Sequence, residues 1–95
     1  MATNTANRAQ HATLTPDTVD TVTLGSNWAN VEVLNRSTSG WITFNVNSSS
    51  SPVIGADETY VVGPGSAVVV PTPSPTPTVV KLICASANEY SVTGL

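Results

Sequence analysis

Residues 28–46 read WANVEVLNRSTSGWITFNV, and this stretch indicates the fold class of the chain. The apolar residues of its two arms alternate with polar ones: Val31 and Val33, then Ile42, Phe44 and Val46. Alternation with a period of two is typical of strands that bury one face and expose the other. The short polar loop between the arms ends in Gly40, which suits an antiparallel hairpin. We therefore expect a hairpin here, with Thr43 and Asn45 facing water.

The rest of the chain carries the same kind of signal. Stretches rich in Val and Thr have the length and composition of short strands, at residues 18–24, 59–62, 67–70, 78–85 and 89–93. Turn signals separate them, and Gly63–Ser66 has Pro and Gly at the central positions of a type II turn. The sequence predicts an all-β fold, a small antiparallel β-sandwich or barrel of about seven or eight short strands, immunoglobulin-like in appearance.

Two segments differ from this pattern. Residues 1–13 are polar and small and show no periodicity, so we expect a flexible N-terminal arm that either does nothing or orders on a partner. Residues 14–95 are then the single β-sandwich domain. The proline-rich stretch at residues 71–77 predicts a stiff, extended connector between sheets rather than a ligand for an aromatic groove.

Charged residues make up only 9% of the chain, and the net charge is −3. The three cations, Arg8, Arg36 and Lys81, are scattered, so we expect no nucleic-acid partner. No apolar run is long enough for a membrane span, and the first residues lack the apolar core of a secretion signal, so we expect synthesis in a cytoplasm. Such a weakly charged surface fits either a protein packed against others or an ordinary β domain with a neutral surface.

Few residues could carry chemistry. The single His11 and the single Cys84 are far apart, so no metal site of the usual His/Cys kind is expected. A Ser-His-Asp arrangement is implausible because His11 lies in the arm. Cys84 sits in an apolar run and is expected to be a buried small hydrophobe. We therefore expect no enzyme activity, no catalytic residue and no cofactor.

Four apolar residues fall outside the main buried rows. Trp28 and Trp41 are out of phase with the apolar residues of their arms, so they either cap the ends of a sheet or anchor an interface. Val79 and Ile83 occupy the second face of the most apolar stretch, which should be a central strand or one covered on both faces. These four residues are the interface candidates.

Three colinear stretches also carry a family resemblance: WANVEVLNRSTSGWITFNV, PVIGADETYVVGPGSAVVVP and TPTVVKLICASANEYSVTG. Over residues 12–95 the chain resembles small virion structural proteins of tailed phages of actinobacteria. It departs from them at Asn45–Ser48, where the family often has Val-Asp-Gly and this chain has a longer, Ser-rich loop. The resemblance rests on the long colinear pattern, since the family has no catalytic signature.

The resemblance implies a virion structural protein. Within that class, it suggests a capsid decoration (cement) protein that binds the outside of the shell formed by the major capsid protein and stabilises it, as a symmetric oligomer. A minor tail or head-fibre component is the alternative within the same class. A small carbohydrate-binding module of immunoglobulin or fibronectin type is the alternative of another class.

Overall fold

The computed structural model of the chain describes residues 3–25, 28–56, 59–72 and 78–95. In these residues there are nine strands and no helix, which confirms the predicted all-β fold. The strands are β1 (Thr3–Ala6), β2 (Ala9–Thr13), β3 (Asp20–Leu24), β4 (Asn30–Asn35), β5 (Ile42–Val46), β6 (Tyr60–Val62), β7 (Ala67–Pro71), β8 (Thr78–Ile83) and β9 (Glu89–Gly94).

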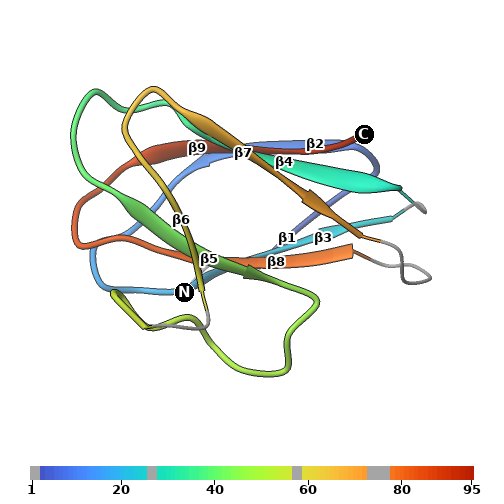
Figure 1. Cartoon of the computed structure of the whole chain (residues 1–95), viewed down its shortest axis with the longest axis horizontal. Helices are drawn as coiled ribbons and strands as arrows, with labels where there is room; N and C mark the ends of the chain where they lie inside the picture. The colour runs from blue at the N-terminus through green and yellow to red at the C-terminus, as the bar shows by residue number, and fades with distance from the viewer. Residues whose placement is uncertain (1–2, 26–27, 57–58, 73–77) are drawn as a thin grey trace.

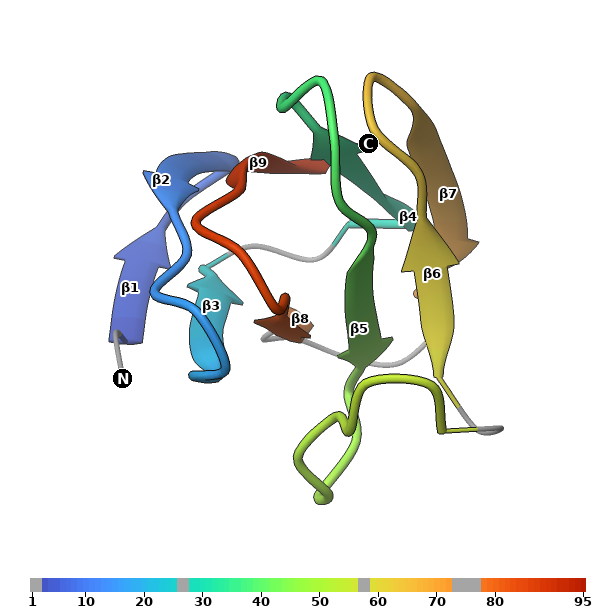
Figure 2. The same cartoon turned by 90° about the vertical axis from the view of Figure 1, so that its left-hand side faces the viewer.

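The strands form two sheets that pack face to face (Figures 1 and 2). Sheet A has the order β1-β3-β8-β5-β6, and sheet B has the order β2-β9-β4-β7. The pairing is antiparallel except between β1 and β3, which run parallel. The predicted central position of the most apolar stretch is confirmed, because β8 lies between β3 and β5.

Strand pairing is nested along the chain. β5 pairs with β6, β4 with β7, β3 with β8 and β2 with β9, as in one long hairpin folded at the β5–β6 loop. Further pairing of β4 with β9 and of β5 with β8 winds this hairpin into two sheets. This is the strand order of a jelly roll. The expected immunoglobulin-like appearance therefore extends to the two packed sheets, whereas the winding is that of a jelly roll.

The hairpin predicted for residues 28–46 is wrong, although both of its strands are present. β4 lies in sheet B and β5 in sheet A, so the loop between them crosses from one sheet to the other. The Gly63–Ser66 turn behaves in the same way: Ser66 N donates to Gly63 O at 3.1 Å and Gly65 has φ +69°, yet β6 and β7 lie in different sheets. Alternation specifies a buried face, but it does not specify the neighbour with which a strand pairs.

The expectation of a flexible arm is corrected over residues 3–13. β1 pairs with β3 from Thr3↔Thr21 to Ala6↔Leu24, and β2 pairs with β9 from Ala9↔Thr93 to Thr13↔Glu89. The edges of the two sheets offer unpaired backbone donors and acceptors, and any extended segment in register can satisfy them. A polar segment can therefore form strands without an apolar pattern, and the sandwich reaches from residue 3 rather than residue 14.

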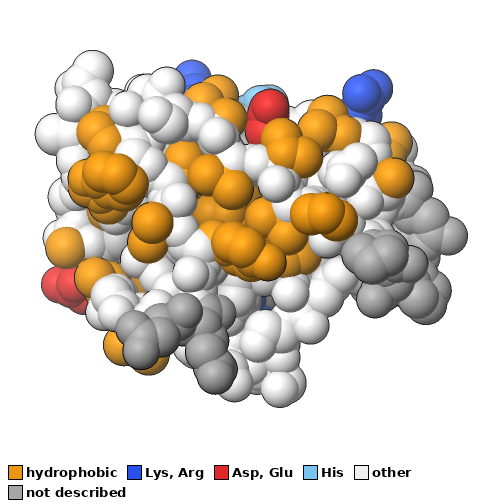
Figure 3. All heavy atoms as spheres, viewed as in Figure 1, with side chains coloured by type: hydrophobic (Ala, Val, Ile, Leu, Met, Phe, Trp, Pro, Cys, Tyr) orange, Lys and Arg blue, Asp and Glu red, His pale blue; other side chains and the backbone are white. Residues whose placement is uncertain are grey.

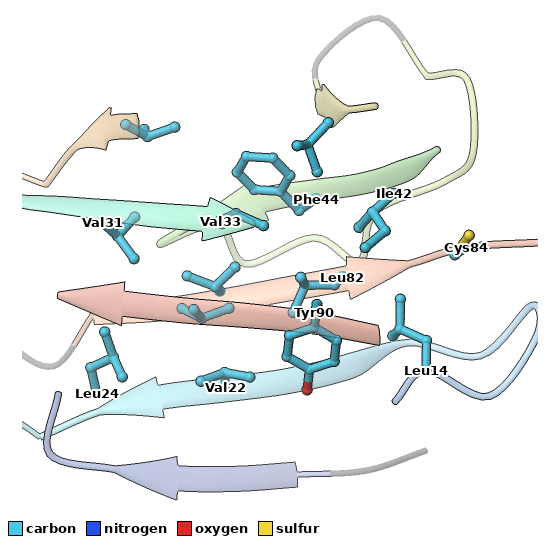
Figure 4. Close-up of a cluster of buried hydrophobic side chains, with 14 residues drawn as sticks. Leu14, Val22, Leu24, Val31, Val33, Ile42, Phe44, Leu82, Cys84 and Tyr90 are labelled. Carbon is cyan, nitrogen blue, oxygen red and sulfur yellow. The ribbon is translucent and has the colours of Figure 1, made fainter. Parts of the chain in front are cut away.

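One hydrophobic core fills the space between the sheets (Figure 4). Its buried members are Leu14, Val22, Leu24, Val31, Val33, Ile42, Phe44, Val62, Val70, Val80, Leu82, Cys84, Tyr90 and Val92. Cys84 is buried and unpaired, as expected from its apolar surroundings. The core residues come from both sheets, so the interior of the jelly roll is filled by side chains.

The outward residues of β5 do not face water, which corrects the expectation for Thr43 and Asn45. Their exposed fractions are only 2% and 7%. The β5–β6 loop folds back over this strand: Asn45 Nδ2 donates to Ser50 O at 2.9 Å, and Pro52 is buried. Among the described residues, Asn45 Oδ1 is a buried side-chain atom with no hydrogen-bond partner. The loop therefore acts as a partial third layer over sheet A.

Most of the proline-rich connector, at residues 73–77, lies outside the described residues. The strands that flank it, β7 and β8, are in opposite sheets. The described parts of the chain contain no helix with the length and apolar character to cross a lipid bilayer.

Candidate interaction surface

Exposed apolar side chains gather along the short edge strand of sheet A. Trp41, Tyr60 and Val61 have exposed fractions of 62%, 47% and 48%, and we call these three residues the β6 edge. Figure 3 shows hydrophobic side chains spread over the face of the molecule on which β6 and β7 lie nearest the viewer in Figure 1. None of the three side chains is charged, so covering them carries no charge-desolvation penalty.

Trp41 lies on the outer face of sheet A and rests on Gly63. The β5–β6 register places Ile42 opposite Val62, so Trp41 stands opposite Gly63 at the end of the ladder. A Cβ atom on Gly63 would lie 3.1 Å from Cη2 of the indole, tighter than ordinary van der Waals contact. The missing side chain at position 63 thus makes a seat for the ring, which is supported on one side and exposed on the other.

Tyr60 and Val61 extend the β6 edge to both sides of the strand. Val61 stands opposite Thr43 on the outer face, diagonally next to Trp41. Tyr60 points the other way and stacks on Phe44, with ring centroids 5.4 Å apart. Sequence reasoning did not select either residue. The available signal was a three-residue strand with bulk on both parities, which is unusual for an edge strand exposed to water.

The other sequence candidates lie in three different settings. Ile83 stands opposite Thr43 on β5, so Ile83, Thr43 and Val61 form one row across the outer face of sheet A. Val79 is on the same face of β8, further along, and both β8 residues are half-buried. The structure thus brings Trp41, Val79 and Ile83 to one face and leaves Trp28 elsewhere. Their role in an interface remains a prediction.

Trp28 caps one end of the sandwich. It packs against the core, and its indole occupies the space that a side chain on Gly94 would need. Its Nε1 donates to Asn7 O at 3.0 Å, and the Arg8 guanidinium lies 5.5 Å from the ring centroid. Of the two roles expected for the tryptophans, Trp28 has the position of a cap and Trp41 has the exposure of an anchor.

At the opposite end of β4, loops form an open polar depression of about 410 Å³. It is lined by residues of the β4–β5 and β8–β9 connections: Arg36, Ser37, Thr38, Ser39, Ser86, Ala87, Asn88 and Glu89. The loops are held from below by Asn35 and Asn88, which are 0% and 3% exposed. The depression has hydroxyl, amide and charged groups but no aromatic side chain among its lining residues.

A polar cluster is buried between the sheets. Tyr90 OH donates to Asp20 Oδ2 at 3.1 Å and accepts from Asn4 Nδ2 at 3.4 Å. Burial raises the pKa of the Tyr90 phenol, the charge and hydrogen bond of Asp20 raise it further, and the hydrogen bond from Asn4 opposes the shift. The phenol therefore stays protonated and links β9 to β3 and β1, which is a structural task.

His11 and Ser91 meet on the outer face of sheet B, with Nδ1 and Oγ 2.6 Å apart. The sequence placed His11 in a flexible arm, whereas β2 holds it directly opposite Ser91. Ser91 is only 6% exposed, so its oxygen is not presented to a substrate. The pair ties β2 to β9. Within the described residues there is no group of three His, Cys, Asp or Glu side chains that could hold a metal ion.

Comparison with known proteins adds to the fold only. No protein-family model and no curated protein sequence matches the chain. Among solved structures the chain is similar to the solution NMR structure of a de novo designed double-stranded β-helix, with a TM-score of 0.60 and 16% sequence identity. The match covers 93% of this chain and 99% of the design. At this identity the likeness concerns the wound two-sheet architecture described above.

Proposed function

We propose that this chain is a capsid decoration protein that binds the outer surface of a major capsid protein shell and stabilises the assembled particle. The proposal combines the family resemblance of residues 12–95 with the geometry of the β6 edge. The observation that carries it is Trp41, 62% exposed and seated on Gly63, next to the exposed Val61. Large aromatic side chains at the centre of an uncharged patch are the usual anchors of protein–protein contacts.

The mechanism needs contact area and no chemistry. Each bound copy covers apolar side chains on itself and on the shell, in a contact of about 1,600 Å² or less. Because the copies bind the assembled shell and not its dissociated subunits, they shift the equilibrium towards the shell by mass action. The low charge of the chain supports this, since few ionic groups lose water when the surface is covered.

The jelly-roll winding is compatible with the proposal by analogy alone. Jelly rolls are common in viral capsid domains, and they also occur in lectins and cupins. The core-filled interior leaves the exterior as the place for function. The partners proposed are the major capsid protein and further copies of this chain.

The test mixes purified protein with undecorated heads and measures occupancy by co-sedimentation and electron microscopy. Val61→Ala and Val69→Ala form a matched pair, because Val61 and Val69 are 48% and 51% exposed on edge strands of opposite sheets. We expect Trp41→Ala to weaken head binding by about tenfold or more, as for an interface anchor. Val61→Ala should weaken it less, and Val69→Ala should bind like the wild type.

Two results would replace the proposal by one of its rivals. If heads stay bare and the protein decorates tails or fibres, it is a minor tail or head-fibre component. If heads stay bare and the isolated domain binds glycans, with loss of binding in Trp41→Ala and Tyr60→Ala, it is a carbohydrate-binding module. The exposed aromatic rings of Trp41 and Tyr60 are the feature that favours this second class.

A further inference from the structure

The first described residues form a unit that is attached to the rest of the domain at two sheet edges. We call residues 3–14 the exchange segment; it contains β1, β2 and Leu14. β1 is the edge strand of sheet A and β2 is the edge strand of sheet B, and Figure 2 shows them on the same side of the sandwich. The segment therefore closes both sheets along one side of the molecule.

Apolar burial contributes little to this attachment. Every residue of β1 and β2 is half-buried or exposed, and Leu14 is the one fully buried residue of the segment. Ala6 and Ala12 make the remaining contacts with the core. Detaching such a segment exposes little apolar surface, so its local opening has a low free-energy cost compared with that of the core strands.

Hydrogen bonds supply the specificity of the attachment. Besides the two backbone ladders, Gly94 N donates to Arg8 O at 2.7 Å and Gly25 N donates to Ala6 O at 2.8 Å. Once the segment detaches, the edges of β3 and β9 are left with unpaired donors and acceptors, which must find another strand. The strand that fits in register is the same segment of another copy.

The connection between the segment and β3 favours opening. It spans residues 15–19, and Asp17 within it has φ +56°, a left-handed conformation that is unfavourable for a residue with a Cβ atom. Pro16 restricts Thr15 to extended conformations. An extended connection would release Asp17 from its present conformation and agree with the preference of Thr15. Short connections under strain promote exchange of elements between copies.

We propose that the exchange segment is swapped between two copies of this chain, so that β1 and β2 of each copy complete the sheets of the other. Each hydrogen bond and the burial of Leu14 are remade across the dimer, so association costs no contact. The arrangement is isologous and closes with two copies. It concerns self-association alone and does not require the capsid function proposed above.

Residues 11 and 91 allow a direct test, because their side chains meet at the β2–β9 ladder. The variant His11→Cys/Ser91→Cys is made in a Cys84→Ala background and oxidised over a range of concentrations, using a mixture of 15N-labelled and unlabelled chains. In the swapped dimer the disulfide between positions 11 and 91 joins two chains, and mass spectrometry finds it between labelled and unlabelled peptides. The His11→Cys and Ser91→Cys single variants, in the same background, measure collisional cross-linking.

The expected result is an interchain disulfide between positions 11 and 91 whose yield rises with the concentration at which the protein is incubated before oxidation. Disulfides formed only within chains, also in the fraction that sediments as a dimer or larger species, would overturn the proposal. If such locked monomers still bind heads, the capsid function stands while the exchange fails.

A second measurement does not depend on introduced cysteines. Asp17 is exposed, and Asp17→Gly relieves the left-handed conformation in the unswapped chain, whereas Asp17→Ala increases its strain. The dimer of Asp17→Ala should be tighter than that of Asp17→Gly by about fivefold per connection, hence about 25-fold for two. Sedimentation equilibrium measures both. A monomer at every concentration for Asp17→Ala, or equal dimerisation of the two variants, contradicts the exchange.

Discussion

Asn88 donates a hydrogen bond of 3.2 Å from Nδ2 to Oδ1 of Asn35, at the end of the sandwich where three loops meet. Asn88 Nδ2 also donates to Ser39 O at 2.9 Å, and Asn35 Nδ2 donates to Gly40 O at 2.9 Å and Val62 O at 3.2 Å. The two amides thus satisfy carbonyls that the crossing between sheets leaves without ladder partners. This pair replaces the tight hairpin that the sequence suggested.

Asn88→Ala should lower the free energy of unfolding by about 1–3 kcal/mol, because it leaves buried carbonyls without a donor. Asn88→Asp should be at least as destabilising, since the carboxylate keeps the shape of the amide but cannot donate. Thr38→Ala, an exposed change in the same loop, should cost less than about 0.5 kcal/mol. Urea unfolding followed by tryptophan fluorescence measures all three. An Asn88→Asp variant as stable as the wild type would disprove the donor role.

Tyr90 makes the stability of the protein depend on alkaline pH. Its pKa is higher in the folded state than in the unfolded chain, because burial and Asp20 disfavour the phenolate. The stability that follows from this is fully present below the unfolded pKa of about 10 and is lost as the pH rises above it. The melting temperature should therefore fall above about pH 10.

In the Tyr60→Phe variant Tyr90 is the only tyrosine, so phenolate absorbance reports on it alone. We expect its ionisation to be delayed until the protein unfolds at high pH. Tyr90→Phe should lose about 1–3 kcal/mol at pH 7, because Asp20 loses a buried hydrogen bond, and should show a weaker alkaline decline. A reversible titration of Tyr90 near the ordinary pKa in the folded protein would refute this account.

Gly94 and Trp28 form a close contact that leaves no room for a side chain at position 94. A Cβ atom there would overlap the indole, which packs against the core and cannot move freely. Gly94→Ala should therefore cost about 1–3 kcal/mol of unfolding free energy. Combining it with Trp28→Ala should cost less than the sum of the single changes, because the clash disappears. Additive losses in the double-mutant cycle would mean that the two positions do not interact.

Asn47 pins the β5–β6 loop to β8. It has φ +51°, its N donates to Val79 O at 2.7 Å, and its Oδ1 accepts from Val79 N at 2.7 Å. Asn47→Asp keeps the acceptor and should be nearly as stable as the wild type. Asn47→Gly keeps only the backbone conformation, and Asn47→Ala keeps neither, so it should be the least stable, by about 1–2 kcal/mol. Thermal unfolding ranks the series, and a different order would exclude this role.

The sequence by itself determined the fold class and most strands. Alternation at residues 31–33 and 42–46 appears as β4 and β5, and the apolar run at residues 78–85 contains the central strand β8. These are local signals, because a strand buried on one face must repeat its apolar residues every second position. Burial of Cys84 follows from the same local composition. The exposure of Trp41 agrees with its place outside the buried row.

The tertiary structure alone decided which strands pair and which exposed residues come together. β4 and β5 belong to opposite sheets because each finds its ladder with strands much later in the chain, and no local pattern encodes that choice. β1 and β2 have no apolar pattern, since edge strands are held by backbone hydrogen bonds that every residue type offers. The seat of Trp41 on Gly63 depends on the register between two strands separated by a loop. Contacts between residues far apart in the chain follow from the winding of the whole jelly roll, and only the folded molecule specifies it.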